Sequence, residues 1–569
     1  MSKYLEFRNA RCKDCYKCLR ECPVKAIDVK DHRAEIIEDR CILCGHCTLA
    51  CPQNAKVVHS EIEEVRRLLA GPDKVVASVA PSFISSFGLT DFGVMKLALA
   101  KLGFSDAEET AIGAQAVTKE YARLLKTGEF KNFITSACPA ACRMIQEYYP
   151  KALKYLAPVD SPMIAHAKII KKQNPDARIV FIGPCIAKKR EAAESHLIDN
   201  VLTYEDMVTL FEEKNIKLDE ITNLVLNQKN GAPNLAKEYP IPQGIINSFP
   251  ELPEGYEYIS VDGPKKCVAT LENIEDLDHV FIEINLCVDA CVNGPCSLVH
   301  AGGSTKSTAD IRKYVSKEKK EMTAPHDNRP NEVDLTAAHP RIRSHSKAAT
   351  EHDIEEILRR TGKIRPEDEL NCGSCGYATC REKAWAVFNG YADIEICLPY
   401  MRQRAESLSF EIIQNSPEGM IVLDPDMNIV EINNKGRELL GIDDPNAKGR
   451  PAMDFFSPID FYNAYNQKKH INVSHMSIPV TGKVVDLSIN YMENHNVIFG
   501  IMKDVTEAVD YENRIMKVKM DTLTTTDEVI KKQMRVAQEI ASLLGETTAE
   551  TKVALLKLKK TLTDDKSSK

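Results

Sequence analysis

Hydrophobic and polar residues alternate in two different patterns along residues 74–300. The segments KVVASVAP and ARIVFIGPC are short apolar runs, which indicate strands that are buried on both faces. The segments DFGVMKLALAKLGF and QAVTKEYARLLK have the apolar spacing of amphipathic helices. This alternation predicts an α/β domain with a largely parallel sheet, whose ligand-binding turns follow the carboxyl ends of the strands.

The pattern changes in the C-terminal half of the chain. After the first alternating region, residues 302–350 are polar and rich in charge, so we expect a linker or an extended arm there. Residues 405–505 alternate again, and EGMIVLDPDMNIVEINNKG reads as two strands around an Asp-Pro-Asp turn followed by a helix. From about residue 506 to 563 the pattern is helical, and apolar residues recur at seven-residue spacing at Val529, Val536 and Leu543.

The composition of the 569 residues narrows the classes of function. The net charge of −8 argues against nucleic acid or an anionic membrane as a main partner. No apolar run reaches the roughly 18 residues of a membrane span, and the start, MSKYLEFRNARC, lacks the apolar core of a secretory signal. We therefore expect a cytoplasmic protein. In a reducing cytosol its 19 cysteines are more typical of metal binding or redox work than of disulfides.

Eight of these cysteines lie in two matching runs within residues 1–60. Three closely spaced thiols and a fourth before a proline are typical of 4Fe–4S ligands, and in two-cluster ferredoxins the fourth cysteine serves the other cluster. One predicted cluster therefore has the ligands Cys12, Cys15, Cys18 and Cys51, and the other has Cys22, Cys41, Cys44 and Cys47. Zinc is the alternative, but the third close cysteine of each run favours the clusters.

Three loops of the α/β region carry four further cysteines. They are FITSACPAAC with Cys138, FIGPCIAKKREA with Cys185, and FIEINLCVDACVNGPC with Cys287 and Cys291. A single cysteine is commonly a small buried apolar residue, but these four thiolates together are enough for one more cluster. Lys188, three residues after Cys185, can place an ammonium donor near an anionic ligand.

The segments ITSACP, GPCIAKKRE and EINLCVDACVNG resemble the three signature loops of the H-cluster domain of FeFe hydrogenases. The resemblance implies that Cys138, Cys185, Cys287 and Cys291 ligate a cubane. It also implies that Cys291 bridges to a two-iron subcluster bearing CO, CN⁻ and a dithiolate amine, which dedicated maturation enzymes supply. Lys188 matches the lysine that hydrogen-bonds a cyanide ligand. The implied substrates are H2 and protons, with a redox partner such as ferredoxin.

The position before the first cubane cysteine differs from the family pattern. In hydrogenases specialised for turnover this residue is a cysteine that relays protons, whereas here it is Ala137, which has no exchangeable proton. Glu120 matches a relay glutamate, but Arg123 and Ala157 stand where a second glutamate and a serine would follow. Since general acid–base groups contribute about 10²–10⁴-fold in rate, we expect slow turnover. Cys296 or a water chain is the alternative proton carrier.

The C-terminal half resembles two further families. The segment NCGSCGYATCREKAWAVFNG and the later EICLPYM resemble a small 4Fe–4S domain with the ligands Cys372, Cys375, Cys380 and Cys397, with zinc as the alternative. Residues 403–506 resemble a PAS domain, which implies ligand sensing or dimerisation and transmission of strain to the following helix. The sequence has no ATP-binding motif after it, so signalling requires a partner such as a protein phosphatase or kinase. Three thiols remain unassigned: Cys142, Cys267 and Cys296.

These interpretations predict an α/β and α+β multidomain fold with six regions: a two-cluster ferredoxin-like domain (1–60), an H-cluster hydrogenase domain (61–301), a polar linker (302–350), a small 4Fe–4S domain (351–402), a PAS domain (403–506) and a helical or coiled-coil signalling segment (507–569). The preferred function is a hydrogen- or redox-sensing FeFe hydrogenase that dimerises through the PAS domain and helix. The alternatives are a metabolic hydrogenase with a regulatory tail and an iron–sulfur assembly protein with a hydrogenase-like fold.

Overall fold

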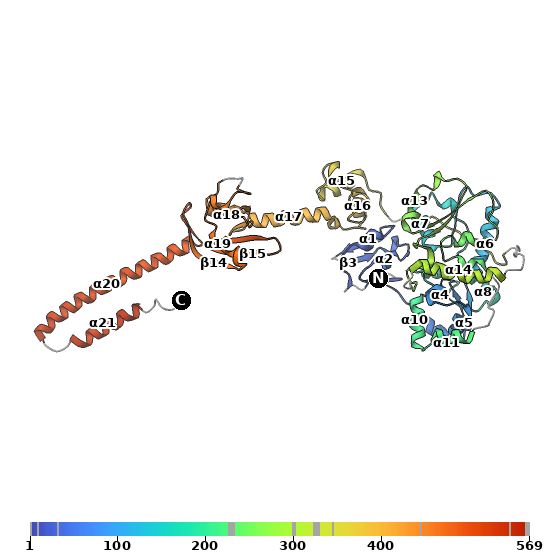
Figure 1. The fold of residues 1–569 in the computed structure, drawn as a ribbon, viewed down its shortest axis with the longest axis horizontal. Helices are drawn as coiled ribbons and strands as arrows, with labels where there is room; N and C mark the ends of the chain where they lie inside the picture. Colours follow the sequence, from blue (N-terminus) through green and yellow to red (C-terminus); the bar gives the residue numbers. More distant parts are fainter. Residues whose placement is uncertain are drawn as a thin grey trace. The chain divides into compact units, whose positions relative to one another are not determined.

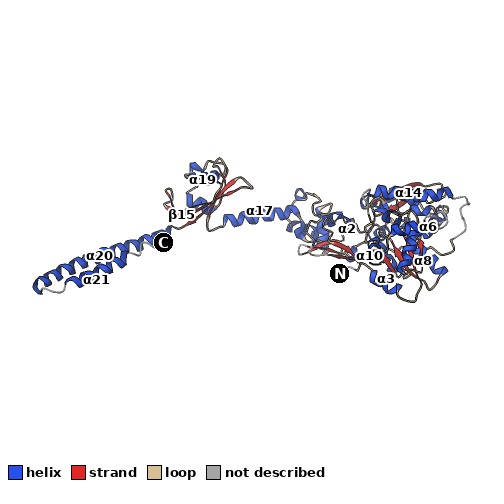
Figure 2. Ribbon diagram, turned by 60° about the horizontal axis from the view of Figure 1, so that its bottom comes forward, coloured by secondary structure: helices blue, strands red, loops and turns tan. Residues whose placement is uncertain are grey.

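The computed structural model of the protein describes residues 3–7, 11–30, 33–225, 234–298, 303–321, 331–343, 346–443, 447–544 and 548–563. The chain forms two compact units, Met1–Met401 and Arg402–Lys569, and each is described by itself. Figure 1 labels the elements along the chain, and Figure 2 distinguishes helices from strands. Among the described helices, none has the length and apolar content needed to cross a membrane.

The first unit begins with a small region built on two short helices, α1 (Lys17–Glu21) and α2 (His46–Ala50). Each helix ends at a cysteine that precedes a proline. Strands β1 (Leu5–Phe7) and β4 (Lys56–Val58) pair antiparallel, as do β2 (Ile27–Lys30) and β3 (Arg33–Ile36). Leu19, Ile42 and Leu43 are buried beneath these elements, so the apolar residues between the cysteines provide the core.

The following α/β domain contains two parallel sheets, as its alternating pattern predicts. The first has the order β6-β5-β8-β9, with bounds Asp106–Glu109, Val75–Val79, Arg178–Ile182 and Asn200–Leu202. The second has the order β10-β11-β7, with bounds Glu257–Asp262, Val280–Asn285 and Phe133–Ile134. β5 is buried along its whole length, and so is β11, which explains their continuous apolar runs.

Helices surround these strands (Figure 2). The two predicted amphipathic segments form α5 (Phe92–Leu102) and α6 (Ala111–Leu125). The helices that follow the loops with cysteine are α7 (Pro139–Tyr148) and α9 (Ala187–Ser195), and α8 (Pro162–Gln173) lies between them in the chain. The other α-helices are α3 (Ile62–Leu69), α4 (Phe83–Phe87), α10 (Tyr204–Glu213), α11 (Leu218–Val225), α12 (Gly244–Asn247) and α13 (Pro264–Glu272).

The described residues between 303 and 343 differ from the expected polar linker. Residues Gly303–Glu321 form helix α14, which buries Ile311 and Val315 completely. After it, residues 331–343 lie along the α/β domain as a segment that we call the strap. The strap buries Leu335, and Thr336 forms an antiparallel bridge with Val159. The polar composition did not predict this packing, because a few apolar side chains are enough to hold a mostly polar stretch against the domain.

The first unit ends in a small region with the helices α15 (Glu351–Arg360) and α16 (Cys380–Phe388), followed by α17 (Leu398–Gln414). The second unit contains an antiparallel sheet of order β13-β12-β16-β15-β14. Its strands are Ile429–Ile432, Gly419–Leu423, Val497–Asp504, Lys483–Met492 and Ile471–Ile478, with the helices α18 (Asn434–Leu440) and α19 (Ile459–Gln467). Helices α20 (Thr506–Leu544) and α21 (Thr548–Thr563) follow, and Lys559 pairs with Asp527 between them at 2.9 Å.

Candidate metal centre

The four cysteines of the α/β domain lie in the loops that follow three parallel strands, β7, β8 and β11. Cys138 follows β7 and caps the N-terminus of α7, with Pro139 in the first helical turn. Cys185 lies between β8 and α9. Cys287 and Cys291 follow β11, and Cys291 lies in a short 3-10 turn. β7 and β11 are neighbours in one sheet, whereas β8 belongs to the other. The loops after all three strands nevertheless bring the thiols close enough to influence one another's pKa.

The pKa values of these thiols indicate that the four cysteines lie close to one another. Burial raises the pKa of Cys185 to about 11, and a nearby Cys138 thiolate adds to the rise. Burial likewise raises the pKa of Cys287 and that of Cys291, and the charges of other cysteines in the group raise both further. Four thiolates in such a place require a compensating positive charge, and an iron–sulfur cluster supplies it. The donor set therefore fits the cubane that the sequence predicts.

Lys188 adds a positive charge beside these thiols. Its Nζ donates to Glu191 Oε2 at 2.7 Å, to Ser161 Oγ at 3.0 Å and to the Ala137 carbonyl at 3.4 Å. Burial opposes its charge, but Glu191 and the cysteines Cys185 and Cys138 raise the pKa of Lys188 above its ordinary value. The ammonium group therefore remains protonated at the bottom of the site.

The relay positions lack a proton carrier around Ala137. Glu120 accepts from Arg123 Nε at 3.0 Å and Nη2 at 2.7 Å, so an ion pair neutralises the relay glutamate. Ala157 is fully buried, and its N–H donates to the Ile134 carbonyl. The nearest side-chain hydroxyl to Ala137 in sequence, that of Ser136, donates to the Val159 carbonyl at 2.6 Å. Residue 137 itself therefore contributes no side-chain donor or acceptor, and the hydroxyl beside it is engaged with Tyr121 and with the Val159 carbonyl.

Cys22, from the first N-terminal run, lies close to the thiols of the second run. Burial raises the pKa of Cys41 to about 11, and Cys22 from the first run adds to the rise. Cys22 also raises the pKa of Cys44 and that of Cys47, after the larger effect of burial. Cys22 thus lies with the second run, although the assignment of each thiol to a cluster remains a prediction.

The loop of this second run packs directly on the α/β domain. Gly45 has φ +74°, and a Cβ there would lie 2.5 Å from two Pro295 carbons and 2.9 Å from Ile186. Beside it, Cys44 is close enough to Cys287 to raise its pKa, as the last of several contributions. Glycine permits this close approach because it has no Cβ and tolerates a positive φ. The second run of cysteines is therefore the one next to the candidate centre.

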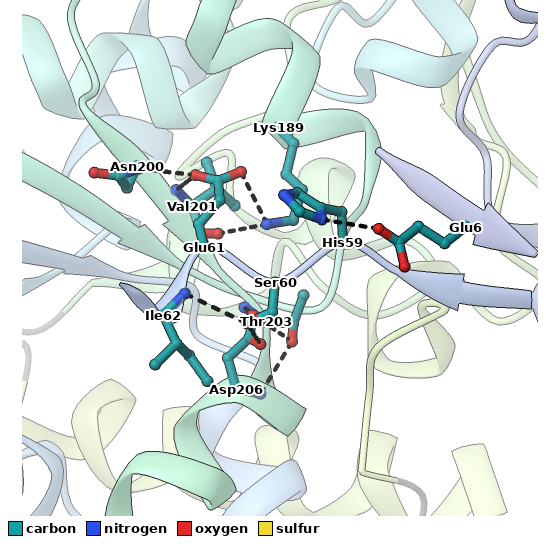
Figure 3. A network of polar contacts seen from close by, with 10 residues as sticks. All are labelled: Glu6, His59, Ser60, Glu61, Ile62, Lys189, Asn200, Val201, Thr203 and Asp206. Carbon is teal, nitrogen blue, oxygen red and sulfur yellow. Dashed lines mark hydrogen bonds and ion pairs between the residues drawn. The ribbon is translucent and has the colours of Figure 1, made fainter. Parts of the chain in front are cut away.

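Polar contacts fix the connection between the two regions (Figure 3). Lys189 is fully buried and its Nζ lies 3.0 Å from Glu61 Oε1, while Glu61 Oε2 accepts from Asn200 and from the Val201 N–H. Ser60 donates to Asp206 at 2.6 Å in the same network. Lys189 anchors α9 from one side, so its neighbour Lys188 is held in the candidate centre.

The four C-terminal cysteines flank α16. Cys375 and Cys397 lie close together, since Cys397 raises the pKa of Cys375 after the larger effect of burial. Lys363 Nζ donates to Cys397 Sγ at 3.4 Å. This region packs on the N-terminal one, because a Cβ on Gly376 would lie 3.1 Å from Leu19.

One further group joins the regions, and sequence reasoning missed it. The Arg40 guanidinium lies 4.5 Å from the ring centroid of Tyr391, and 5.5 Å from the centroids of both Trp385 and Tyr148. The signal in the sequence was an arginine directly before Cys41 and the chain's single tryptophan in the small cysteine-containing region.

The three unassigned thiols are buried. Cys142 donates to the Ser136 carbonyl at 3.4 Å and Cys267 to the Asn285 carbonyl at 3.3 Å, which indicates structural roles. Cys296 is 1% exposed, and burial holds its pKa well above the ordinary range. In the part of the chain that the structure describes, no three His, Cys, Asp or Glu side chains are arranged to hold a metal ion.

Models of four known families match separate regions of the chain, and these regions correspond to the ones described above. The model of the iron only hydrogenase large subunit, C-terminal domain, matches residues 73–252, which include Cys138, Cys185 and Lys188. The 4Fe-4S dicluster domain matches residues 11–55, a putative Fe-S cluster domain residues 368–399, and the PAS fold residues 410–504. The predicted multidomain fold is confirmed at this level.

Individual relatives include hydrogenases and an assembly factor. The periplasmic [Fe] hydrogenase large subunit of Nitratidesulfovibrio vulgaris is 30% identical over 314 residues, covering 49% of this chain and 73% of the relative. The NADP-reducing hydrogenase subunit HndD of Solidesulfovibrio fructosivorans is 28% identical, and the alignment covers 42% of this chain but only 46% of that relative. The cytosolic Fe-S cluster assembly factor NAR1 of Eremothecium gossypii is 26% identical over 195 residues, 31% of this chain and 43% of that protein.

Proposed function

Because the chain belongs to the iron-only hydrogenase family and also contains a PAS domain, we propose that it is a hydrogen- or redox-sensing hydrogenase with slow turnover. The observation that carries the proposal is Ala137, next to the cubane cysteine Cys138, in a site whose lysine is kept. A slow enzyme disposes of electrons poorly, but it can report whether hydrogen is present.

The residues of the candidate centre have defined tasks in this proposal. Cys138, Cys185, Cys287 and Cys291 would hold the cubane, and Cys291 would also hold the two-iron subcluster. When bound, the H-cluster supplies the metal chemistry that interconverts H2 with two protons and two electrons. Lys188 donates to an anionic ligand from a position that Glu191 and Ser161 fix. Ala137 offers no proton, so protons must leave by a slower route than the thiol of the family.

Electrons leave through the regions that pack on this site. The contact of Gly45 with Pro295 supports transfer between the candidate centre and the cluster of Cys22, Cys41, Cys44 and Cys47. The packing of Gly376 on Leu19 supports a further step to the cluster of Cys372, Cys375, Cys380 and Cys397. The PAS domain and its exit helix would pass the redox signal to a protein phosphatase or kinase, with the chain acting as a homodimer.

The first test is infrared spectroscopy on protein that has been matured without oxygen and then exposed to hydrogen, with activity measured on the same sample. The proposal predicts CO and CN⁻ bands that shift under hydrogen, together with slow turnover. Bands with fast turnover would indicate a metabolic hydrogenase with a regulatory tail. Absence of these bands after full maturation would favour an assembly protein, the class to which the NAR1 relative belongs by name.

A further inference from the structure

The strap lies over the part of the α/β domain where the relay residues are missing. Asp160 N–H donates to the Leu335 carbonyl at 2.8 Å, and Ala337 N–H donates to the Pro158 carbonyl at 3.1 Å. Further along the strap, Ile342 N–H donates to the Gln146 carbonyl at 3.0 Å. Gln146 is on α7, the helix that begins at the cubane cysteine. The strap is therefore held on both sides of one residue, His339.

His339 is turned toward the protein. Main-chain hydrogen bonds connect its imidazole with Ala157 and Val159, and Ala157 is the position where a relay serine is missing. Its Nε2 is buried and has no hydrogen-bond partner among the described residues. Pro340 follows directly and restricts His339 to an extended backbone. Buried polar atoms nearly always have hydrogen-bond partners. The unpartnered Nε2 of His339 therefore indicates a functional role.

Glu191 is the charged side chain that acts on His339, and its carboxylate raises the pKa of the imidazole. The same carboxylate accepts from Lys188 at 2.7 Å, so Glu191 acts electrostatically on both His339 and the lysine of the candidate centre. Among the charged side chains nearby, Asp160 pairs with Lys168 at 2.6 Å, and the charge of Asp334 on the strap also acts on Asp160. Arg143 pairs with Glu147 at 3.3 Å and with Glu194 at 4.0 Å. Burial lowers the pKa of His339, whereas Glu191 and the main-chain hydrogen bonds raise it less.

We propose that His339 is the proton carrier of this centre and replaces the thiol and hydroxyl that Ala137 and Ala157 lack. The proposal rests on the hydrogenase function above and deepens it. In the direction of hydrogen oxidation, neutral His339 accepts on Nε2 a proton that is released at the candidate centre, and it becomes imidazolium. It then releases the same proton to water and returns to the neutral form, so no further reactant is consumed. Imidazole suits this task because its ordinary pKa lies close to neutral pH.

The test compares His339→Gln with the wild type after full maturation. Glutamine keeps hydrogen-bonding groups but cannot carry a proton at neutral pH. We expect turnover and hydrogen–deuterium exchange to fall about 10²-fold. We also expect that the pH-dependent shift of the infrared CO and CN⁻ bands, which reports the charge on His339, is lost. His279→Gln is the matched control, because His279 is exposed in the same domain, where it lies beside Asp278 and the Tyr256 ring at the surface.

A second variant, Glu191→Gln, leaves the strap unchanged and removes the negative charge near His339. Its infrared transition should move to lower pH, because imidazolium loses a stabilising charge. Wild-type rates and an unchanged infrared transition in His339→Gln would overturn the role of His339. If the wild type itself develops no CO and CN⁻ bands, the proposed hydrogenase function is wrong. This outcome is distinct from the one that would overturn the role of His339 alone. Iron content and thermal unfolding of each variant show whether it folds and loads its clusters.

Discussion

The guanidinium of Arg40 lies 4.5 Å from the centre of the Tyr391 ring. The two residues belong to different cysteine-containing regions, and Arg40 directly precedes Cys41. The backbone carbonyl of Arg40 also accepts from Tyr148 of the α/β domain at 2.7 Å. One buried arginine therefore connects the three regions that hold the predicted clusters.

Replacing Arg40 by alanine should loosen the region that contains α15 and α16. A cation–π contact contributes about 0.5–2 kcal/mol, more when it is desolvated, and Arg40 contacts three rings. We expect faster hydrogen exchange in residues 351–397 of Arg40→Ala, measured by mass spectrometry. Arg402→Ala is the control, because Arg402 is exposed and pairs only with Glu406, one helical turn away. Equal exchange in both variants would contradict the structural role of Arg40.

Replacing Gly45 by alanine should separate the second cysteine run from the α/β domain. The new Cβ would meet Pro295 at 2.5 Å, and overpacking typically costs about 1–3 kcal/mol. A positive φ adds roughly 1–2 kcal/mol for a residue with a side chain. We expect a lower apparent stability and slower electron transfer between the two regions, followed by stopped-flow spectroscopy.

Gly128 provides the matched control for this variant. It has φ +70°, close to the value at Gly45, but a Cβ there would have no atom within 4 Å. Gly128→Ala should therefore introduce the same backbone strain as Gly45→Ala, but without a steric clash like the one with Pro295. If the two variants lose the same stability and transfer electrons at the same rate, the contact with Pro295 is not what holds the regions together.

Introducing a thiol at residue 137 should accelerate turnover. Ala137→Cys restores the group that the family uses to move a proton, and a general acid–base group is worth about 10²–10⁴-fold. Because Arg123 and Ala157 still interrupt the rest of the relay, we expect the lower end of this range. Ala137→Val, which adds similar bulk without a proton, should show no gain in hydrogen evolution. A gain in both variants would attribute the effect to packing.

The stability of the α/β domain should depend on the protonation of Glu283. This buried carboxylate accepts from the Ile245 and Ile246 N–H groups at 2.9 and 3.1 Å, yet burial raises its pKa from 4.5 to about 7. Since the folded protein binds the proton more tightly, this contribution to stability is complete below pH 4.5. It decreases as the pH rises to about 7. One pKa unit corresponds to about 1.4 kcal/mol, so the loss is about 3 kcal/mol.

Glu283→Gln should remove this dependence. Unfolding measured between pH 4.5 and 7 should give a flatter profile than the wild type. Glu257→Gln serves as the control, since Glu257 is exposed on the adjacent strand β10. A wild-type slope that persists in Glu283→Gln would assign the pH dependence to other groups.

Removing Cys397 should remove one cluster only. The thiol is buried in the small region of α16, and Lys363 donates to it. Cys397→Ser should lower the iron content by about four atoms per chain, the content of one 4Fe–4S cluster, and remove one electron paramagnetic resonance signal of the reduced protein. Cys267→Ser, at a thiol that only donates to a carbonyl, should leave both unchanged. Loss of zinc instead of iron would favour the zinc alternative.

The sequence by itself determined the local chemistry of this protein. Cysteine spacing and neighbouring prolines act over a few residues, so the runs at residues 12–51 predict clusters without any knowledge of the fold. Continuous and alternating apolar patterns likewise predicted β5, β8, α5 and α6, because burial on one or two faces depends on nearby residues. The loops with Cys138, Cys185 and Cys287 were found in the same way.

Tertiary structure decided what lies next to these motifs. The strap was expected to be part of a polar linker, but it places His339 against Ala157, and no local pattern predicts a contact between residues so far apart in the chain. The approach of Gly45 to Pro295 and the position of Arg40 among three rings have the same origin. Such contacts depend on packing between whole elements, where the energy of each pair is small and only their sum fixes the arrangement.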